Sequence, residues 1–170
     1  MASKIYLIDT GVLVQAKRSY YAFDFCPGFW DMIIYSHTVA LIESIDKVKD
    51  EINNGYKGDE LLDWVKANIK SAFFNSTNNP QTAAVYKDII NWAAGQKYTP
   101  AALAYFAKGA DGWLIAHALL HNKIVVTMEK PDSASKRNIK IPNVCNAFGV
   151  QWMDTFDMIR GLGHKLILRR

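Results

Sequence analysis

Short apolar segments alternate with longer segments of helical character along this chain, and the alternation limits the folds open to it. The segments Lys4–Ile8, 39–42, 123–127 and 149–152 are apolar and of strand length. Strands that are separated by helices pair in parallel and carry helices on both faces of the sheet. The sequence therefore predicts a three-layer α/β/α domain around a central, mainly parallel sheet of about four to five strands.

Capping signals mark where the expected helices begin. Ser44 and Asp59 each precede a segment with apolar residues at helical spacing, so each is expected to act as an N-cap. Asn79 and Thr99 are each followed by proline, which favours the first turn of a helix. The stretch 56–108 is expected to be a helical insertion packed on the same core of a single domain. In chain order, the expected helices are 29–36, 45–52, 59 to Phe73, 80–95, 100 onward, 110–121 and 155–162, with a short extended piece at 139–141.

Composition and length place the chain among ordinary globular domains. It has 170 residues, of which 50% are hydrophobic and 21% are charged, which excludes a disordered chain. No apolar run approaches the roughly 20 residues that span a bilayer. An acidic residue appears too early in the chain for a signal or transit peptide to be expected. We therefore expect no membrane association and a cytoplasmic location. Cys26 and Cys145 are expected to be free thiols.

Positive charge exceeds negative charge in this sequence. The net charge is +4 and the pI is about 9.0, which favours a polyanionic partner. Lys136, Arg137 and Lys140 concentrate part of this charge. A solvated, solubilising surface is the alternative explanation for the same residues.

Two acidic residues follow expected strands. Asp9 ends the first strand, and Glu129 lies two residues beyond Thr127 at the end of the 123–127 strand. A period of two places Thr127 and Glu129 on the same side of an extended chain. Ligands of open parallel sheets bind outside the carboxyl ends of the strands. We therefore expect Asp9 and Glu129 to lie at a ligand site.

Two further acidic residues are placed by helices. Asp111 lies in the first turn of the apolar helix 110–121, where a helix cap or a dipole partner is the alternative role. Glu51 lies about a quarter turn from the buried stripe of the helix 45–52, whereas Asp50 points nearly opposite to it. Glu51 rather than Asp50 can therefore face a cleft beside the sheet.

Carboxylates gathered at one rim repel one another. Two like charges about 4 Å apart cost roughly 4 kcal/mol at an effective dielectric constant of 20. None of the Lys or Arg residues in the four acidic segments is placed to neutralise these charges. A divalent cation with oxygen ligands, Mg²⁺ or Mn²⁺, is the expected partner, and such an ion supports phosphodiester hydrolysis. The expected metal ligands are Asp9, Glu51, Asp111 and Glu129.

Four segments, taken in order, resemble the motifs of PIN domains. The first is a strand that ends in Asp followed by Thr, the second a Glu late in a helix, the third Ala-Asp before apolar positions, and the fourth Thr-x-acid after a strand. These segments are Tyr6-Leu-Ile-Asp-Thr-Gly-Val-Leu13, Val48-Lys-Asp-Glu51, Ala110-Asp-Gly-Trp-Leu-Ile-Ala116 and Val125-Val-Thr-Met-Glu129. Cys26-Pro-Gly-Phe-Trp30 and Lys140-Ile-Pro-Asn-Val-Cys145 resemble a poorly characterised bacterial PIN-like branch.

The resemblance implies a metal-dependent endoribonuclease acting on single-stranded RNA. It also implies the toxin half of a bacterial toxin–antitoxin pair. A cognate antitoxin and a second copy of the same chain, in a homodimer, would be the partners. Asp9, Glu51 and Asp111 would hold the metal, and Glu129 would complete the site, through water. Thr10 and Thr127 would orient water or carboxylates by hydrogen bonds. Lys136, Arg137 and Lys140 would hold the RNA backbone.

Two positions depart from the PIN pattern. Glu129 stands where the family usually has Asp, and its extra methylene puts direct metal ligation there in question. Gly11 stands where bulkier residues are common, although the exchange carries no evident chemical penalty. The first departure motivates an alternative function: a catalytically inactive PIN-fold module that binds RNA or protein.

Other sites suggested by single motifs are less well supported. Asp9-Thr10-Gly11 is also the triplet of aspartic proteases, but those enzymes need two such triplets on a β-rich body. His117 and His121 have the spacing of a zinc helix but lack the intervening Glu and an evident third ligand. The aromatic stretch 20–30 could stack on bases, form part of the core or form a homodimer face.

Overall fold

The structure is a computed structural model that describes residues 4–167. Its centre is a five-stranded sheet in the order β3-β2-β1-β4-β5, and every neighbouring pair of strands is parallel. This confirms the expected mainly parallel α/β architecture. The strands are β1 Tyr6–Ile8, β2 Ile42–Ile45, β3 Phe74–Asn75, β4 Ile124–Val126 and β5 Trp152–Met153.

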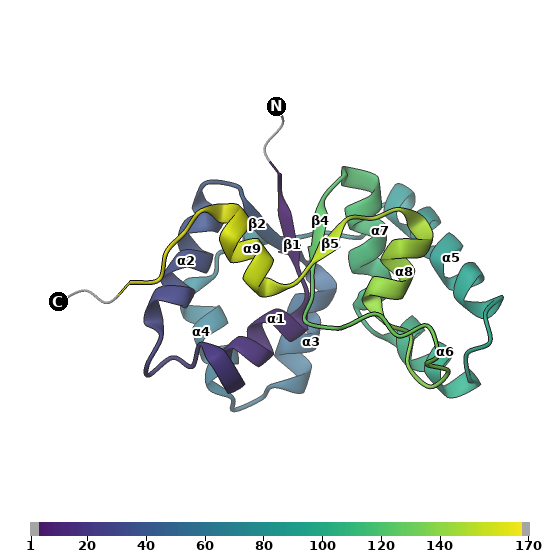
Figure 1. The fold of residues 1–170 in the computed structure, drawn as a ribbon, viewed down its shortest axis with the longest axis horizontal. Helices are drawn as coiled ribbons and strands as arrows, with labels where there is room; N and C mark the ends of the chain where they lie inside the picture. Colours follow the sequence, from purple (N-terminus) through teal and green to yellow (C-terminus); the bar gives the residue numbers. More distant parts are fainter. Residues whose placement is uncertain (1–3, 168–170) are drawn as a thin grey trace.

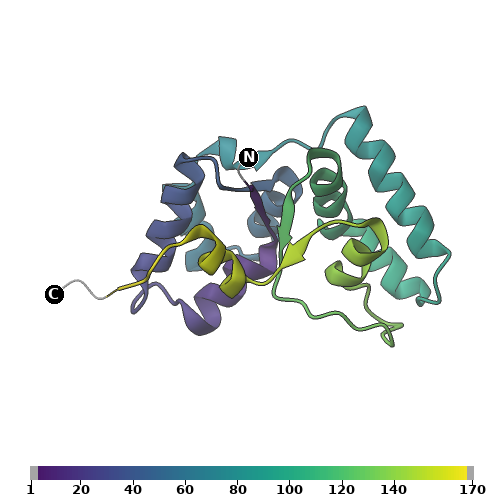
Figure 2. The ribbon, with the colours of Figure 1, turned by 45° about the horizontal axis from the view of Figure 1, so that its top comes forward.

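The two central strands are apolar because helices cover both of their faces. All residues of β1 and β4 are buried, and Leu7 pairs in register with Val125. Strands buried on both faces read as continuous apolar runs rather than as alternating ones. Figures 1 and 2 show α1, α2, α4 and α9 on one face of the sheet and α5, α6, α7 and α8 on the other.

The helices follow the strands in the order expected for parallel crossovers. The expected caps at Asp59, Asn79 and Thr99 are confirmed, because each side chain accepts a hydrogen bond from a backbone N–H in the first turn of its helix. The helices are α1 Thr10–Gln15, the π-helical turn η1 Ala16–Tyr20, α2 Pro27–Thr38, α3 Asp46–Gly55, α4 Glu60–Asn68, the 3₁₀ turn η2 Ser71–Phe73, α5 Pro80–Ala94, α6 Pro100–Lys108, α7 Asp111–His121, α8 Ile141–Phe148 and α9 Thr155–Leu162.

The second strand begins later than the sequence predicts. Ala40 adopts a positive φ of 57°, and the strand starts only at Ile42. Ser44 is therefore not a helix cap: it lies inside β2, is fully buried, and donates a 2.7 Å hydrogen bond to the carbonyl oxygen of Ile8. The buried hydroxyl satisfies a carbonyl of the neighbouring strand, which explains a polar residue at this position.

Two further elements differ from expectation. The stretch 56–108 is not wholly helical, because Phe74–Asn75 forms the edge strand β3 beside β2. The expected extended piece at 139–141 is instead the entry to α8, which begins at Ile141 with Pro142 in its first turn. Proline at this position was the signal for a helix start.

Residues 4–167 contain no helix with both the length and the apolar character that crossing a bilayer requires. Both cysteines are free, as expected: Cys26 is half-buried and Cys145 is buried.

Candidate acidic site at the carboxyl end of the sheet

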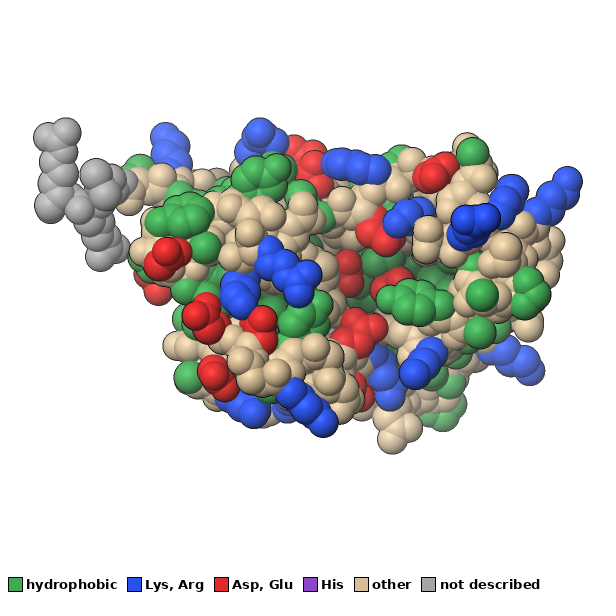
Figure 3. All heavy atoms as spheres, turned by 90° about the horizontal axis from the view of Figure 1, so that it is seen from below, with side chains coloured by type: hydrophobic (Ala, Val, Ile, Leu, Met, Phe, Trp, Pro, Cys, Tyr) green, Lys and Arg blue, Asp and Glu red, His purple; other side chains and the backbone are tan. Residues whose placement is uncertain are grey.

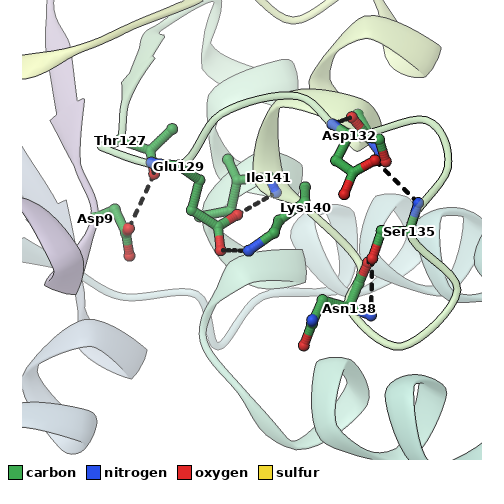
Figure 4. A network of polar contacts seen from close by, with 9 residues as sticks. Asp9, Thr127, Glu129, Asp132, Ser135, Asn138, Lys140 and Ile141 are labelled. Atoms are coloured by element: carbon green, nitrogen blue, oxygen red, sulfur yellow. Dashed lines mark hydrogen bonds and ion pairs between the residues drawn. The ribbon is translucent and has the colours of Figure 1, made fainter.

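Asp9 is held at the edge between the two central strands. It follows the last residue of β1, and its backbone N–H donates to the carbonyl oxygen of Val126 in β4, at 3.0 Å. Its side chain is buried, and Oδ2 accepts a hydrogen bond from Thr127 Oγ1 at 3.2 Å (Figure 4). The ends of β1 and β4 thus place a carboxylate and a hydroxyl together, as the sequence predicts.

Gly11 leaves room for the Asp9 carboxylate. A Cβ atom added at Gly11 would lie 2.9 Å from Asp9 Oδ2, closer than real Cβ contacts come. The absence of a side chain at this position therefore has a steric reason, which the sequence alone did not provide.

Glu51 joins three helices at the rim of the site. Its Oε2 accepts a hydrogen bond from Thr10 Oγ1 at 2.5 Å, and its Oε1 accepts one from the backbone N–H of Ala110 at 2.8 Å. Thr10 begins α1, Glu51 lies in α3, and Ala110 precedes α7. Glu51 faces the cleft, as its place beside the buried stripe predicts.

Asp111 is the first residue of α7, yet it does not cap the helix. No hydrogen bond from a residue within 4–167 reaches its carboxylate. Burial raises the pKa of Asp111 well above its ordinary value, and the charges of Asp9, Glu129 and Glu51 raise it further. Of the two alternative roles, a helix cap is not observed, whereas Asp111 does lie in the first turn of α7, where a dipole partner would lie.

The pKa of the Asp9 carboxyl is also raised, and by some of the same acidic neighbours. The pKa of Asp9 is raised from 3.8 to about 7, first by burial and then by the charges of Glu129 and Glu51. The backbone N–H of Gly11 and the hydroxyl of Thr127 act in the opposite direction. The four acidic residues thus share one electrostatic environment, and Figure 3 shows acidic side chains around a hollow near the middle of one face.

Glu129 is occupied differently from the other three acids. Its Oε2 accepts a 2.7 Å hydrogen bond from the backbone N–H of Ile141, and its Oε1 lies 3.3 Å from Lys140 Nζ (Figure 4). The longer Glu side chain reaches from the end of β4 to the start of α8, where a helix favours negative charge. Lys140 thus neutralises one acid of the group from outside the four acidic segments.

The donor set matches a hard divalent cation, but its geometry is not preformed. Asp9 and Asp111 are neighbouring carboxylates with few protein donors, and oxygen ligands suit Mg²⁺ or Mn²⁺. Within residues 4–167, no group of three or more acidic, His or Cys side chains already stands in an arrangement that could hold a metal ion. Binding would require carboxylates to turn towards a common point.

The three basic residues expected to hold RNA lie in two environments. Lys136 and Arg137 are exposed and form no ion pair with an acid among residues 4–167. Lys140 is partly buried and paired with Glu129. Asp132 accepts hydrogen bonds from the backbone N–H groups of Ala134 and Ser135, which orders the loop that carries these residues (Figure 4).

The aromatic stretch 20–30 packs mainly on itself. Tyr21 stacks on Phe29 with ring centres 4.4 Å apart, and Phe23 stacks on Trp30 at 4.2 Å. Phe29 and Trp30 are buried in the core. Packing therefore explains most of this stretch, and its buried rings are not available to bases.

The histidine pair of α7 does not form a zinc site. His117 is buried, and its Nε2 lies 3.3 Å from Lys123 Nζ, whereas His121 is exposed. Lys123 also forms an ion pair with Glu43. The ammonium group of Lys123 next to the imidazole takes the place that a metal ion would occupy.

One family model covers nearly the whole sequence. The model described as "Domain of unknown function (DUF4411)" matches residues 6–166. The chain belongs to the DUF4411 family. No curated protein matches this DUF4411 sequence.

Solved structures share the fold of this DUF4411 domain at low sequence identity. FitAcB from Neisseria gonorrhoeae has a TM-score of 0.53 at 16% identity, with 88% of this chain and 96% of that chain covered. VapBC-1 from nontypeable Haemophilus influenzae has a TM-score of 0.53 at 17% identity, with coverages of 88% and 97%. VapBC2 from Rickettsia felis, solved with a DNA fragment from its promoter, has a TM-score of 0.52 at 12% identity, with coverages of 88% and 98%. The DUF4411 domain therefore has the PIN-like fold that its four motifs predict.

Proposed function

We propose that this chain is a divalent-metal-dependent endoribonuclease that hydrolyses phosphodiester bonds of single-stranded RNA. The observation that carries the proposal is the pair of carboxylates Asp9, which is buried, and Asp111, which is half-buried; they come from separate elements, and the charge of Asp9 raises the pKa of Asp111. Burying two like charges together lowers stability unless a cation binds them, so such pairs are typical of functional sites. Glu51 and Glu129 add negative charge to the same hollow.

The residues of the chain have distinct roles in this proposal. Asp9, Asp111 and Glu51 would hold Mg²⁺ or Mn²⁺, and Glu129 would contribute its charge from the start of α8, directly or through water. Thr10 and the backbone N–H of Ala110 hold both oxygens of Glu51 in place. Each carboxylate oxygen has a second lone pair that remains available to a ligand.

The same assignment explains the hydroxyl beside Asp9. Thr127 donates to Oδ2 of Asp9 and thereby restrains the rotation of this carboxylate. When bound, the cation would supply a Lewis acid for the phosphodiester and lower the pKa of a water molecule. Lys136, Arg137 and Lys140 would contact the RNA backbone, so that binding weakens as salt is raised.

We further propose that the chain is the toxin component of a bacterial toxin–antitoxin system, acting in the cytoplasm with a cognate antitoxin and as a homodimer. The support is the shared fold with VapBC-1, VapBC2 and FitAcB, whose names denote two-component complexes. Expression of this chain alone should slow bacterial growth, and coexpression of the product of the neighbouring gene should restore it. Unimpaired growth with active enzyme present would contradict the toxin assignment.

Cleavage of RNA by the purified chain tests the nuclease proposal. The parent should cut single-stranded RNA with Mg²⁺ or Mn²⁺ and stop when EDTA is added. Asp9→Asn should lower the rate by at least about 100-fold, because a neutral amide is a poor ligand for a hard cation. Asp88→Asn, which changes an exposed acid on α5, is the matched control and should retain the parental rate. Equal rates for Asp9→Asn and the parent would overturn the assignment.

A non-catalytic binding module is the second candidate, and one observation favours it. Lys140 and the Ile141 amide occupy both oxygens of Glu129, so that this acid is already satisfied without a metal. RNA binding by the parent without metal binding or cleavage would support this candidate and contradict the first.

A further inference from the structure

A groove adjoins the acidic site on the side of α3, α6 and α7. It has a volume of about 560 Å³ and is lined by Lys47, Glu51, Tyr105, Lys108 and Trp113, among others. Glu51 also accepts hydrogen bonds from Thr10 and Ala110 in the acidic site. Because Glu51 belongs to both the groove and the acidic site, a ligand in the groove would lie beside that site.

Tyr105 stands on the rim of this groove with its ring free. It is 78% exposed, although its neighbour on α6, Phe106, is only 2% exposed. Trp113 on the opposite wall differs, because its ring stacks on Tyr86 at 3.9 Å and Lys47 lies 5.7 Å from its centre. Trp113 is thus a packed wall, whereas Tyr105 offers an uncovered aromatic face.

A second hollow lies on the other side of Tyr105. It has a volume of about 480 Å³ and is lined by Thr99, Tyr105, Arg137 and Asn138, among others. The backbone N–H of Thr99 donates to the carbonyl oxygen of Lys136 at 2.9 Å, which fastens the basic loop to the start of α6. Tyr105 therefore forms a ridge between the groove at Glu51 and the loop that carries Arg137.

Basic residues flank this ridge without acidic partners. Lys108 at the end of α6 and Lys136 and Arg137 in the loop are exposed, and none forms an ion pair with another described residue. Free cations at intervals along a path, with an aromatic ring between them, are the features that bind single-stranded nucleic acid. The acidic hollow at one end of the path would repel such a strand unless its own charge is neutralised.

We propose that a single RNA strand crosses the ridge at Tyr105, with one base stacked on the tyrosine ring and its phosphates contacted by Lys108 and Arg137, and enters the groove beside Glu51. This inference rests on the proposed function for the purpose of the strand, but binding can be measured without cleavage. Stacking on an aromatic face tolerates any base, so the ridge would bind RNA without strong sequence preference.

Fluorescence anisotropy with a labelled ten-nucleotide oligouridine tests the ridge on the full chain. EDTA prevents cleavage, and the repulsion from the acidic hollow that it leaves is common to the parent and every variant. Tyr105→Ala should weaken binding about tenfold, and Tyr105→Trp should restore it to within about threefold, since stacking needs only an aromatic face. Phe25→Ala, at a 64% exposed aromatic residue remote from the groove lining, is the matched control and should bind as the parent does. Unchanged binding by Tyr105→Ala would overturn the inference.

The salt dependence of RNA affinity distinguishes the contribution of the basic residues from that of the Tyr105 ring. Lys108→Ala and Arg137→Ala should each reduce the slope of log affinity against log salt by about one, whereas Tyr105→Ala should leave the slope unchanged. Equal slopes for all variants would contradict phosphate contacts at Lys108 and Arg137.

Three outcomes distinguish an error in the proposed RNA path at Tyr105 from an error in the nuclease proposal. If the parent cleaves RNA and Tyr105→Ala binds and cleaves as well as the parent, the ridge is wrong and the nuclease stands. If the parent never cleaves but binds RNA through Tyr105, the ridge stands and the nuclease is wrong. If Tyr105→Ala binds RNA normally but escapes relief by the product of the neighbouring gene, the groove binds a protein partner and the RNA path is refuted.

Discussion

Gly11 is the residue whose size most directly limits the position of a proposed metal ligand. The Asp9 carboxylate lies over the first turn of α1, in the space that a side chain at Gly11 would fill. Alanine would favour the helix but would push Oδ2 away from Thr127, because the added carbon would lie 2.9 Å from that oxygen.

Gly11→Ala should therefore separate activity from stability. We expect the rate of RNA cleavage to fall roughly 10- to 100-fold, because small displacements of a reacting group have effects of that size. The free energy of unfolding should change by less than about 1 kcal/mol. Gly55→Ala at the end of α3, where a Cβ would meet nothing within 4 Å, should change neither quantity. A parental cleavage rate for Gly11→Ala would contradict the proposed place of Asp9.

The positions of the acids could be predicted from the sequence, but their hydrogen-bond partners could not. Asp9 follows an apolar strand and Asp111 begins an apolar helix, so the topology alone brings both to one edge of the sheet. The contact between Glu129 and Lys140 depends on side-chain rotamers and on where α8 begins. The exposure of Tyr105 likewise depends on which face of α6 packs inward.

At the scale of elements, α8 depends on an acid that precedes it by 12 positions in the chain. Glu129 accepts from the N–H of Ile141, the first residue of α8, and pairs with Lys140, whose backbone is the extended N-cap. Helix α8 packs on α7, which carries Asp111. The acid at the end of β4 thus anchors an element of the same layer that presents a proposed metal ligand.

Glu129→Asp tests this anchor. The shorter side chain would lose contact with the Ile141 N–H and with Lys140, so urea unfolding should show a loss of about 1 kcal/mol. Glu60→Asp makes the same exchange at an exposed site and should remain within about 0.5 kcal/mol of the parent. If both variants unfold at the parental urea concentration, Glu129 does not anchor α8.

Helices that begin with a strong cap signal could be predicted from the sequence. The two-residue strand β3 and the buried position of Ser44 could not. The caps at Asp59, Asn79 and Thr99 correctly marked where α4, α5 and α6 begin, although α4 ends at Asn68 rather than at Phe73. β3 contains only two residues and depends on pairing with β2, which no local pattern reveals. Serine is a residue type that favours helix N-caps, but the burial of Ser44 and its hydrogen bond to Ile8 outweigh that preference.

At the scale of the whole molecule, the acidic hollow should make stability depend on pH. The pKa of Asp9 rises from 3.8 to about 7 in the folded chain, so the folded state holds this proton more tightly than the unfolded state. The resulting stabilisation is complete below the unfolded pKa and is lost as pH rises through about 7. Asp111, whose pKa is also raised, acts in the same direction.

Thermal unfolding of the metal-free parent and of Asp9→Asn between pH 5 and pH 8 measures this dependence. The parent should lose about 1–3 kcal/mol relative to the variant as pH rises, because only the parent must ionise Asp9. The lowered pKa of His121 acts in both proteins and cancels in the difference. Saturating Mn²⁺ should reverse the loss at pH 8 in the parent alone. Parallel profiles for the two proteins would show that Asp9 ionises without a penalty.

The central claim is that a divalent cation neutralises Asp9 and Asp111, and calorimetric titration with Mn²⁺ near pH 6.5 tests it most directly. Asp9 should be partly protonated at that pH, so that binding releases protons and the measured heat depends on the ionisation enthalpy of the buffer. The account predicts one saturable site in the parent, with up to about one proton released per ion, and its loss in Asp111→Asn. No binding by the parent, or equal binding by Asp111→Asn, would contradict it.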